Sequence, residues 1–241
     1  MNVLIYNEYR HEQDPNDRSG KIYPEGMHAV LARALETEPE IRVRTVTLDT
    51  VNEITADVLK ETDVLLWWGH CHHAEVPDEV ARLVQEAVLN GMGAVFLHSA
   101  HNSKPFMLLM GTSCSLIWRE SEDMERVWVS APYHPIAAGL DRFFEIEADE
   151  TYGEPFGIPT PDETVLIGWF TGGEVFRAGC TWQRGWGRVF YFQPGHETFP
   201  VYYDPNVQTV LRNAVRWAAP ARRTENCMDC PNPPKAHRGA L

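Results

Sequence analysis

Three short apolar runs of this chain are each followed by histidine. His70, His72 and His73 follow Val64–Trp68, His98 and His101 follow Ala94–Leu97, and His196 and Glu197 follow Val189–Phe192. Short apolar runs rich in Val, Leu and aromatic residues are typical of buried strands. Because ligands bind outside the carboxyl ends of the strands in an open α/β sheet, we expect these side chains to converge there. The pattern predicts a pocket built of imidazoles and carboxylates.

The first hundred residues alternate between strand and helix patterns. Strands are predicted at Asn2–Tyr6, Arg42–Leu48, Val64–Trp68 and Ala94–Leu97. Helices are predicted within Pro24–Glu38, in a short segment that ends with Asp57–Lys60, and from Pro77 onward. This βαβαβαβ order predicts an α/β fold with a parallel sheet and right-handed crossovers.

The second half of the chain is less regular and predicts antiparallel strands that extend the sheet. The candidate strands are Arg126–Ser130, Phe143–Glu147, Val165–Phe170, Val175–Thr181 and Arg188–Phe192. A final helix is predicted near Asp204 and Pro205, which suit an N-cap and a first helical position. The polar segment that follows predicts a C-terminal tail over residues 220–241, after one domain over residues 1–219.

The charge balance narrows the choice of partners. The chain has 34 acidic and 21 basic residues and a formal net charge of -13 at pH 7, whereas nucleic acids and anionic membranes require basic patches. We therefore expect a neutral or cationic small molecule as partner, and neither nucleic acid nor membrane. The N-terminus has no signal-peptide pattern, and no apolar stretch is long enough to span a membrane. With five scattered cysteines, this predicts a reduced cytoplasmic protein; the oligomeric state stays open, a homo-oligomer included.

His98 is the foremost catalytic candidate. It stands where a buried strand gives way to Ser99 and a predicted helix, so it should project into the crevice and face the helix N-terminus. An unperturbed imidazole, with a pKa of about 6.5, suits acid–base chemistry or metal ligation. The alternative is a structural histidine that caps the helix or binds a backbone carbonyl.

Further candidates follow the other strands. In EADETYGEP, Glu150 and Tyr152 could act as base and orienting donor, unless the segment is an ordinary solvated acidic loop. His196 and Glu197 would point to opposite sides of an extended backbone, so at most one should reach a given substrate atom; the alternative is a turn-stabilising pair. His11, His72 and His101 also follow predicted strands, where they could bind a ligand or belong to ordinary loops.

A C-x-x-C motif lies in the predicted tail. Cys227 and Cys230 have the spacing of one half of a tetrahedral zinc site, and His237 follows nearby. A fourth ligand would have to come from the rest of the chain or from another subunit. Incidental cysteines in a tail are the alternative.

The order of several motifs resembles the trehalose-utilisation (ThuA-like) family. They are LLWWGH, GMGAVFLHSAH, HPIAAGLDRFFEIEADETYGEP, GWGRVFYFQPGHE and LRNAVRWA, and the resemblance covers residues 1–219. The chain lacks G-x-S-x-G, G-x-x-x-x-G-K-[ST] and G-x-G-x-x-G, so no nucleotide cofactor is expected. The resemblance implies a flavodoxin-like three-layer sandwich, with helices on both faces of a mainly parallel sheet and added antiparallel strands.

The same resemblance implies a function in carbohydrate metabolism. The fold is similar to that of class I glutamine amidotransferases, but His98 stands where those enzymes keep a cysteine nucleophile, which argues against glutaminase activity. A disaccharide or keto-sugar derivative is the expected substrate, and proton transfer would be divided among His98, Glu150 and His196.

The remaining candidates are assigned to substrate binding. The proposed contacts are His11, His72, His101, Tyr152, Trp182 and Glu197, and Trp67 and Trp68 are further candidates for the faces of sugar rings. A divalent metal, zinc by ligand type, could assist the reaction. The alternatives are a non-catalytic sugar-binding or regulatory module and a metal-dependent hydrolase with imidazole ligands.

Overall fold

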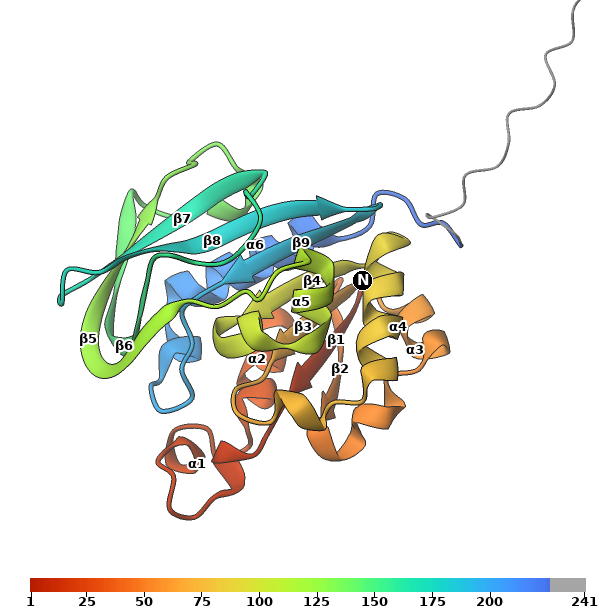
Figure 1. The fold of residues 1–241 in the computed structure, drawn as a ribbon, viewed down its shortest axis with the longest axis horizontal. Coiled ribbons are helices and arrows are strands. Elements are labelled where there is room, and N and C mark those ends of the chain that lie inside the picture. The colour runs from red at the N-terminus through yellow and green to blue at the C-terminus, as the bar shows by residue number, and fades with distance from the viewer. Residues whose placement is uncertain (226–241) are drawn as a thin grey trace, which may run out of the picture.

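A nine-stranded sheet runs through the computed structural model, which describes residues 1–225 (Figure 1). Its order is β2-β1-β3-β4-β9-β8-β7-β5-β6. The parallel strands are β2 (Arg42–Thr47), β1 (Asn2–Asn7), β3 (Val64–Trp68), β4 (Gly93–Leu97) and β9 (Gly187–Phe192). The antiparallel strands are β8 (Val175–Arg184), β7 (Glu163–Phe170), β5 (Ile117–Val129) and β6 (Phe143–Gly153).

Strand β9 joins the parallel and antiparallel parts of the sheet. It pairs parallel with β4 and antiparallel with β8. The register aligns the carboxyl ends of neighbouring parallel strands, because Asn7 lies beside Trp68, Trp68 beside Leu97, and Leu97 beside Phe192. The loops that carry the histidines therefore leave the sheet at the same level.

Helices cover both faces of the sheet, as the α/β prediction requires. One face holds α2 (Met27–Leu35) and α6 (Pro205–Ala218), and the other holds α3 (Ala56–Glu61), α4 (Asp78–Leu89) and α5 (Lys104–Met110). Successive strand residues point to opposite faces, so Val3 and Ile5 pack with the first group while Leu4 and Tyr6 pack with the second. The three-layer α/β fold is confirmed. A short helix, α1 (Ser19–Ile22), lies within the loop after β1.

Two segments differ from their predicted conformations. The acidic segment Asp149–Gly153 lies within strand β6 and pairs with β5, instead of forming a solvated loop. Its Glu150 lines the site described below and its Asp149 is buried, so this part of the strand has no apolar run by which the sequence could reveal it. After β4, His98–Asn102 forms a 3-10 turn before α5, so His98 does not stand directly at an α-helix N-terminus.

The chain after α6 continues along the side of the sheet that α3 and α4 cover. Arg223 donates to the backbone carbonyl of Lys60 at 2.9 Å, and the Thr224 N–H donates to the carbonyl of Asn90 at 2.9 Å. The predicted zinc half-site of Cys227, Cys230 and His237 lies outside the described residues. Within residues 1–225, no helix is long and apolar enough to cross a membrane.

Candidate functional site

A cavity of about 530 Å³ opens at the carboxyl ends of the parallel strands. The loop after β1 contributes His11, Asp17 and Arg18, and the loop after β3 contributes His70 and Cys71. The curved hairpin of β5 and β6 (Figure 1) supplies Glu120–Glu122 and Glu150, and the loop after β9 supplies His196–Phe199. Segments far apart in the chain thus form one site.

His98 lies buried behind the cavity wall, at the end of β4. Its backbone has φ +50°, a left-handed conformation that is uncommon for a residue other than glycine. Its Nδ1 donates to the Gln193 carbonyl at 2.8 Å, and its Nε2 lies 3.0 Å from Oε2 of Glu150. Burial lowers the pKa of His98, but the hydrogen bond to Glu150 and the charges of Asp149 and Glu150 outweigh it and leave the pKa raised. With acceptors at both ring nitrogens, the imidazolium form is favoured.

Glu150 is the member of this pair that faces the cavity. Burial raises its pKa, but the hydrogen bond from His98 and the nearby imidazoles outweigh burial and hold the pKa below its usual value. Its position depends on its neighbour Asp149, which accepts the backbone N–H groups of Gly195 at 2.9 Å and His196 at 3.1 Å. These bonds tie β6 to the loop after β9.

His196 and Glu197 both line the cavity, on one side of it. Their Nε2 and Oε2 atoms are 3.7 Å apart, and His196 Nε2 is 3.9 Å from Oε2 of Glu150. The backbone is not extended before them, because Gly195 has φ +138°. Burial lowers the pKa of His196 to about 4. The imidazole is therefore neutral at pH 7.

Glu197 forms an ion pair with His70 at the centre of the site. His70 Nδ1 lies 2.9 Å from Glu197 Oε1, and His11 Nδ1 lies 3.5 Å from the same oxygen. Burial alone would raise the pKa of Glu197, but the hydrogen bond to His70 and the charges of His196, His70 and His11 lower it to about 2. For His70, burial lowers the pKa, but the contact with Glu197 reverses that effect and raises it.

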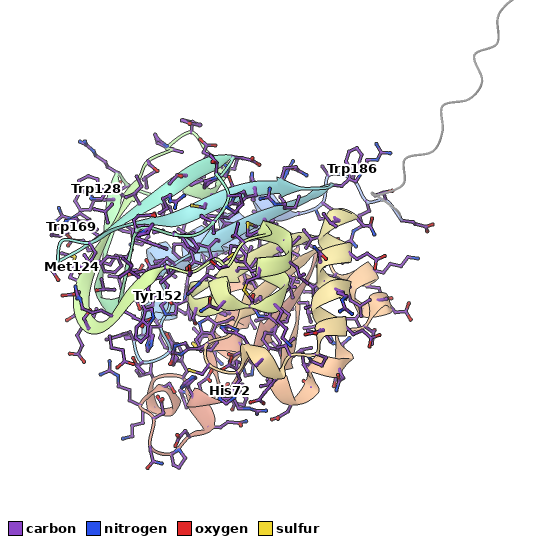
Figure 2. All side chains as sticks on the ribbon, viewed as in Figure 1. His72, Met124, Trp128, Tyr152, Trp169 and Trp186 are labelled. Atoms are coloured by element: carbon purple, nitrogen blue, oxygen red, sulfur yellow. The ribbon has the colours of Figure 1, made fainter. Side chains whose placement is uncertain are left out.

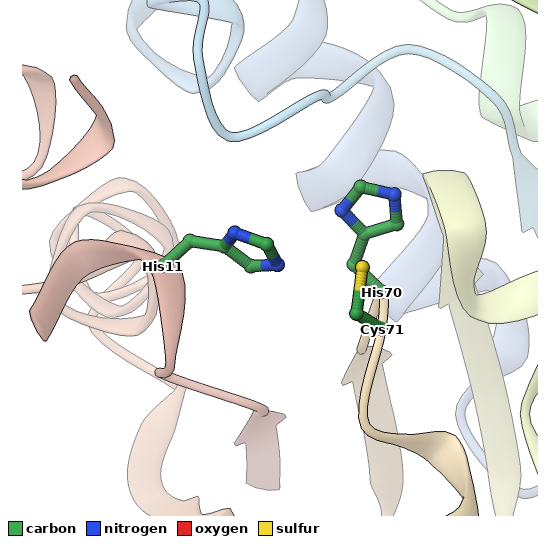
Figure 3. A group of neighbouring side chains, drawn as sticks. All are labelled: His11, His70 and Cys71. Carbon is green, nitrogen blue, oxygen red and sulfur yellow. The ribbon is translucent and has the colours of Figure 1, made fainter. Parts of the chain in front are cut away.

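Two loops meet at His11 and His70. Figure 3 shows the His11 side chain projecting toward the His70 ring, with the sulfur of Cys71 at the base of the His70 side chain. The ring centroids are 5.1 Å apart. Burial and the charges of Glu8 and Glu197 raise the pKa of Cys71, so its thiolate is disfavoured.

Glu8 supports the site although sequence reasoning did not single it out. Its buried carboxylate accepts the backbone N–H groups of His70 at 2.8 Å, Cys71 at 3.1 Å and His72 at 3.0 Å. It thereby fixes the loop that carries His70. Its place directly after β1 is the signal that could have identified it, since the same rule identified the histidines.

The remaining candidate residues lie outside the cavity lining. Tyr152 is buried and stacks on His98, with ring centroids 4.8 Å apart. His101 is bonded to the Cys114 carbonyl at 2.7 Å, and Trp182 donates to the Pro159 carbonyl at 3.2 Å, both within the core. His72 forms a hydrogen bond with Glu75 at 2.5 Å. In Figure 2 the labelled His72 and Tyr152 lie in different parts of the molecule. Trp67 and Trp68 are also buried and do not line the cavity.

The cavity lining is strongly acidic. Within residues 1–225 it includes five carboxylates, from Asp17, Glu120, Glu122, Glu150 and Glu197, against one guanidinium, from Arg18. Arg18 pairs with Glu122 at 2.9 Å and lies over the Phe199 ring at 4.6 Å from its centroid. Sequence reasoning missed Arg18 and Phe199, since neither lies in a patterned motif.

Three overlapping groups of side chains in residues 1–225 have donor atoms that could hold a metal ion. They are His11, His70 and Cys71; His70, His196 and Glu197; and His98, Glu150 and His196. Within each group, the donor atoms lie within 4.8 Å of one another. His70 and His196 link the three groups into one continuous cluster.

Known proteins share this fold. A family model described as ThuA, trehalose utilisation, matches residues 2–218. A ThuA-like protein from Parabacteroides merdae has a TM-score of 0.68 at 18% identity, over 93% of this chain and 91% of that one. A ThuA-like protein from Bacteroides uniformis has a TM-score of 0.65 at 18% identity, over 90% and 91%. A cytoplasmic protein of Salmonella typhimurium has a TM-score of 0.59 at 14% identity, over 91% and 100%. No curated protein sequence matches the chain.

Proposed function

The chain belongs to the ThuA family, and we propose that it is an enzyme of carbohydrate metabolism. Its substrate is an unphosphorylated disaccharide or a keto derivative of one, and its reaction is proton transfer at a carbon beside a carbonyl group. The family description, trehalose utilisation, supports the substrate class. The acidic, partly buried cavity supports the reaction class.

The observation that carries the proposal is the pair of Glu150 and His98. Glu150 faces the cavity while its Oε2 is held at 3.0 Å by the buried His98 Nε2. A fixed, ionised carboxylate at a cavity wall suits a general base, which must reach the proton that it removes. In this proposal Glu150 is the catalytic residue, and His98 is a positioning residue that acts through it.

The charge of the cavity selects among sugars. Five lining carboxylates against one guanidinium would repel a phosphate group, whereas carboxylates accept hydrogen bonds from neutral hydroxyl groups. Phe199 also lines the cavity, but it is 7% exposed and its ring lies under the Arg18 guanidinium, so it offers a sugar ring little contact. Hydrogen bonds to the sugar hydroxyl groups therefore carry the proposed recognition.

The reaction can be followed on the chain's own groups. Glu150 takes the proton from the carbon beside the carbonyl, and the electron pair moves toward the carbonyl oxygen. His196, neutral and with its Nε2 on the cavity side, contacts that oxygen. Isomerisation follows when the first oxygen takes up the proton of the neighbouring hydroxyl and Glu150 returns its proton to the former carbonyl carbon. Elimination follows when the electron pair instead expels a group from the next carbon, and that group leaves with the proton.

The proposed enzyme is not a glutaminase, and we infer that it acts in the cytoplasm. His98 occupies the strained position after β4, and Cys71, the thiol in the cavity lining, has a raised pKa. Neither group supplies the thiolate that such a reaction requires. The free thiols of Cys71, Cys114 and Cys180 support a reducing compartment.

The test is proton exchange followed by NMR in D₂O. The full chain is incubated with trehalose, other neutral disaccharides, their keto derivatives and the corresponding sugar phosphates. We expect deuterium to appear at the carbon beside the carbonyl of a neutral keto-sugar, and product to follow. Glu150→Gln should lower the exchange rate by about 10²–10⁴-fold.

Glu145→Gln is the matched control. Glu145 lies on the same strand but pairs with Arg126 away from the cavity, so its substitution should leave exchange unchanged. Full exchange in Glu150→Gln would contradict the role of Glu150. Tight sugar binding without exchange or product would instead favour a sugar-binding module.

A further inference from the structure

Two buried polar atoms face each other in the site without a hydrogen bond. Nε2 of His196 and Oε2 of Glu197 have no hydrogen-bond partner within residues 1–225. The side chains are 7% and 2% exposed, and these two atoms are 3.7 Å apart. Buried polar atoms normally have a partner, because desolvation without one costs free energy. A ligand held between them would satisfy both.

We propose that His70, His196 and Glu197 form a binding site for a divalent cation, zinc by their donor chemistry. Their donor atoms lie within 4.8 Å of one another, with His70 Nδ1 at 2.9 Å from Glu197 Oε1. Tetrahedral zinc with bonds of about 2.0–2.1 Å separates its ligand atoms by roughly 3.3 Å. The separations of 2.9 and 3.7 Å bracket this value, so small shifts of these side chains bring them to a shared ion.

The surroundings already orient these donors. Thr198 contacts the Nδ1 side of His196, with its Oγ1 at 2.8 Å and its backbone N–H donating at 3.3 Å, so Nε2 is the nitrogen left without a partner. When Nε2 binds a metal, the Thr198 hydroxyl can accept the proton that Nδ1 then carries. A second hydrogen bond of this kind is typical of metal-binding histidines. Asp149 holds the backbone of His196, and Glu8 holds the backbone of His70.

The other two groups are less suited to a metal. His98 already uses both ring nitrogens, on Gln193 and Glu150, so neither is free to bind a metal. In the group of His11, His70 and Cys71 the thiol is exposed, whereas His196 and Glu197 of the chosen group are both buried. His11, with Nδ1 3.5 Å from Glu197 Oε1, is the nearest additional donor to the chosen group.

Three protein ligands leave a coordination position open toward the cavity, as in catalytic zinc sites. This inference rests on the proposed function and deepens it, because an ion held by His196 would take the place of Nε2 and polarise the substrate oxygen itself. Metal binding itself does not depend on a sugar. The two proposals can therefore fail separately.

The experiment is calorimetric titration of the full chain with Zn²⁺ after removal of bound metal, together with metal analysis of the untreated protein. We expect one tight site per chain in this group. Loss of an outer-shell partner costs metal sites about 10–100-fold in affinity, so Glu197→Gln and His196→Gln, which remove ligands, should cost about 100-fold or more. Thr198→Val removes no ligand, so it should lower the Zn²⁺ affinity by about 10-fold. It still tests the site if the first two variants do not fold.

Two control variants separate this site from its competitors. Cys71→Ser tests the group with His11, and the double variant Cys227→Ser with Cys230→Ser tests the tail; both should retain the tight site. Co²⁺ in place of Zn²⁺ should give a spectrum without a thiolate charge-transfer band. Unchanged affinity in folded Glu197→Gln, or loss of the site in either control, would overturn the proposal.

Discussion

Nε2 of His98 lies 3.0 Å from Oε2 of Glu150, and the carboxylate is the partner that lines the cavity. The imidazole sits fully buried behind it. In the proposed reaction, this order places the His98 cation out of reach of the substrate and the Glu150 base within reach of it. The chemistry of the pair is therefore asymmetric, although sequence reasoning gave both residues similar roles.

The first prediction concerns the pH dependence of activity in His98→Asn. Asparagine tolerates the positive φ of this position better than most residues, but it cannot supply the cation. Burial of Glu150 is then opposed only by the weaker effects of His196 and His70, so the pKa of Glu150 rises. Since the base works when deprotonated, the acidic limb of the pH–rate profile should move to higher pH, and kcat should fall about 10–100-fold.

His72→Asn is the control for this profile. His72 pairs with Glu75 outside the cavity, so its substitution should leave the acidic limb in place. A profile of His98→Asn that falls in amplitude without moving would show that His98 does not act through Glu150.

Glu8→Gln should lower both stability and the order of the His70 loop. The carboxylate accepts three backbone N–H groups, from His70, Cys71 and His72. In glutamine the side-chain NH₂ group replaces one of the two oxygens, and as a donor it cannot accept a hydrogen bond from these N–H groups. We expect the free energy of unfolding to fall by about 2–3 kcal/mol, the range for hydrogen bonds to charged groups. Urea unfolding measures this loss.

The exposed pair of Glu53 and Arg44 provides a comparison. Glu53→Gln should change the free energy of unfolding by less than about 1 kcal/mol, as is usual for surface ion pairs. Equal effects of the two substitutions would argue against a supporting role of Glu8.

The sequence was sufficient to predict that histidines from different strands meet. Apolar runs mark β3, β4 and β9, and the parallel register then aligns their ends at Trp68, Leu97 and Phe192. The residue type of Glu150 made it a candidate for acid–base chemistry, but the sequence did not show how its side chain reaches the site. It reaches the site because the β5–β6 hairpin curls back, and that curvature follows from irregular pairing between Arg119 and Glu125 that no local pattern announces.

Residue type alone was a poor guide to the remaining contacts. Trp182 and His101 suit sugar binding by chemistry, yet their side chains pack in the core and bond to backbone carbonyls. In an extended strand, neighbouring side chains point to opposite sides, so His196 and Glu197 were expected on opposite sides of the backbone. Gly195 has a φ of +138°, the backbone is not extended there, and both side chains line the cavity. Arg18 and Phe199 come from loops whose paths depend on tertiary packing.

Glu125→Gln should change how stability depends on pH. Glu125 is fully buried; burial and, next, the charge of Asp149 raise its pKa well above its usual value. A carboxyl with a raised pKa stabilises the fold at low pH, and this contribution is lost as pH rises from the unfolded value toward the folded one. The variant should gain stability relative to the wild type across that interval, by at most about 1.4 kcal/mol per pH unit.

Gln193 helps to make this substitution acceptable. Its side-chain amide, oriented with the nitrogen toward Glu125, lies 2.7 Å from Oε1 and 3.1 Å from Oε2. The amide oxygen that Glu125→Gln introduces can accept the same bond. Chemical unfolding at a series of pH values tests the prediction. Parallel stability curves for the two proteins would contradict it.

Gly195→Ala should damage the site through the backbone. A Cβ at this position would lie 2.1 Å from the Tyr202 hydroxyl oxygen, and φ +138° is rare for any other residue. We expect a loss of about 1–3 kcal/mol in the free energy of unfolding from the backbone strain alone. Displacement of His196 should also reduce Zn²⁺ affinity.

Gly173→Ala isolates the backbone effect from the clash. Gly173 also has a positive φ, in the turn between β7 and β8, but a Cβ there meets no atom within 4 Å. This variant should lose stability and retain Zn²⁺ affinity. If Gly195→Ala bound Zn²⁺ as tightly as Gly173→Ala, the position of His196 would not depend on the turn at Gly195.

The position of β9 between β4 and β8 has a consequence for biosynthesis. The strand that connects the two parts of the sheet is the last to leave the ribosome, and His196 and Glu197 follow it directly. Contacts between such distant segments form late in folding. A nascent or prematurely terminated chain that ends before β9 lacks both the central strand pairing and the lining residues His196 and Glu197, so the site is assembled only after synthesis has passed Glu197.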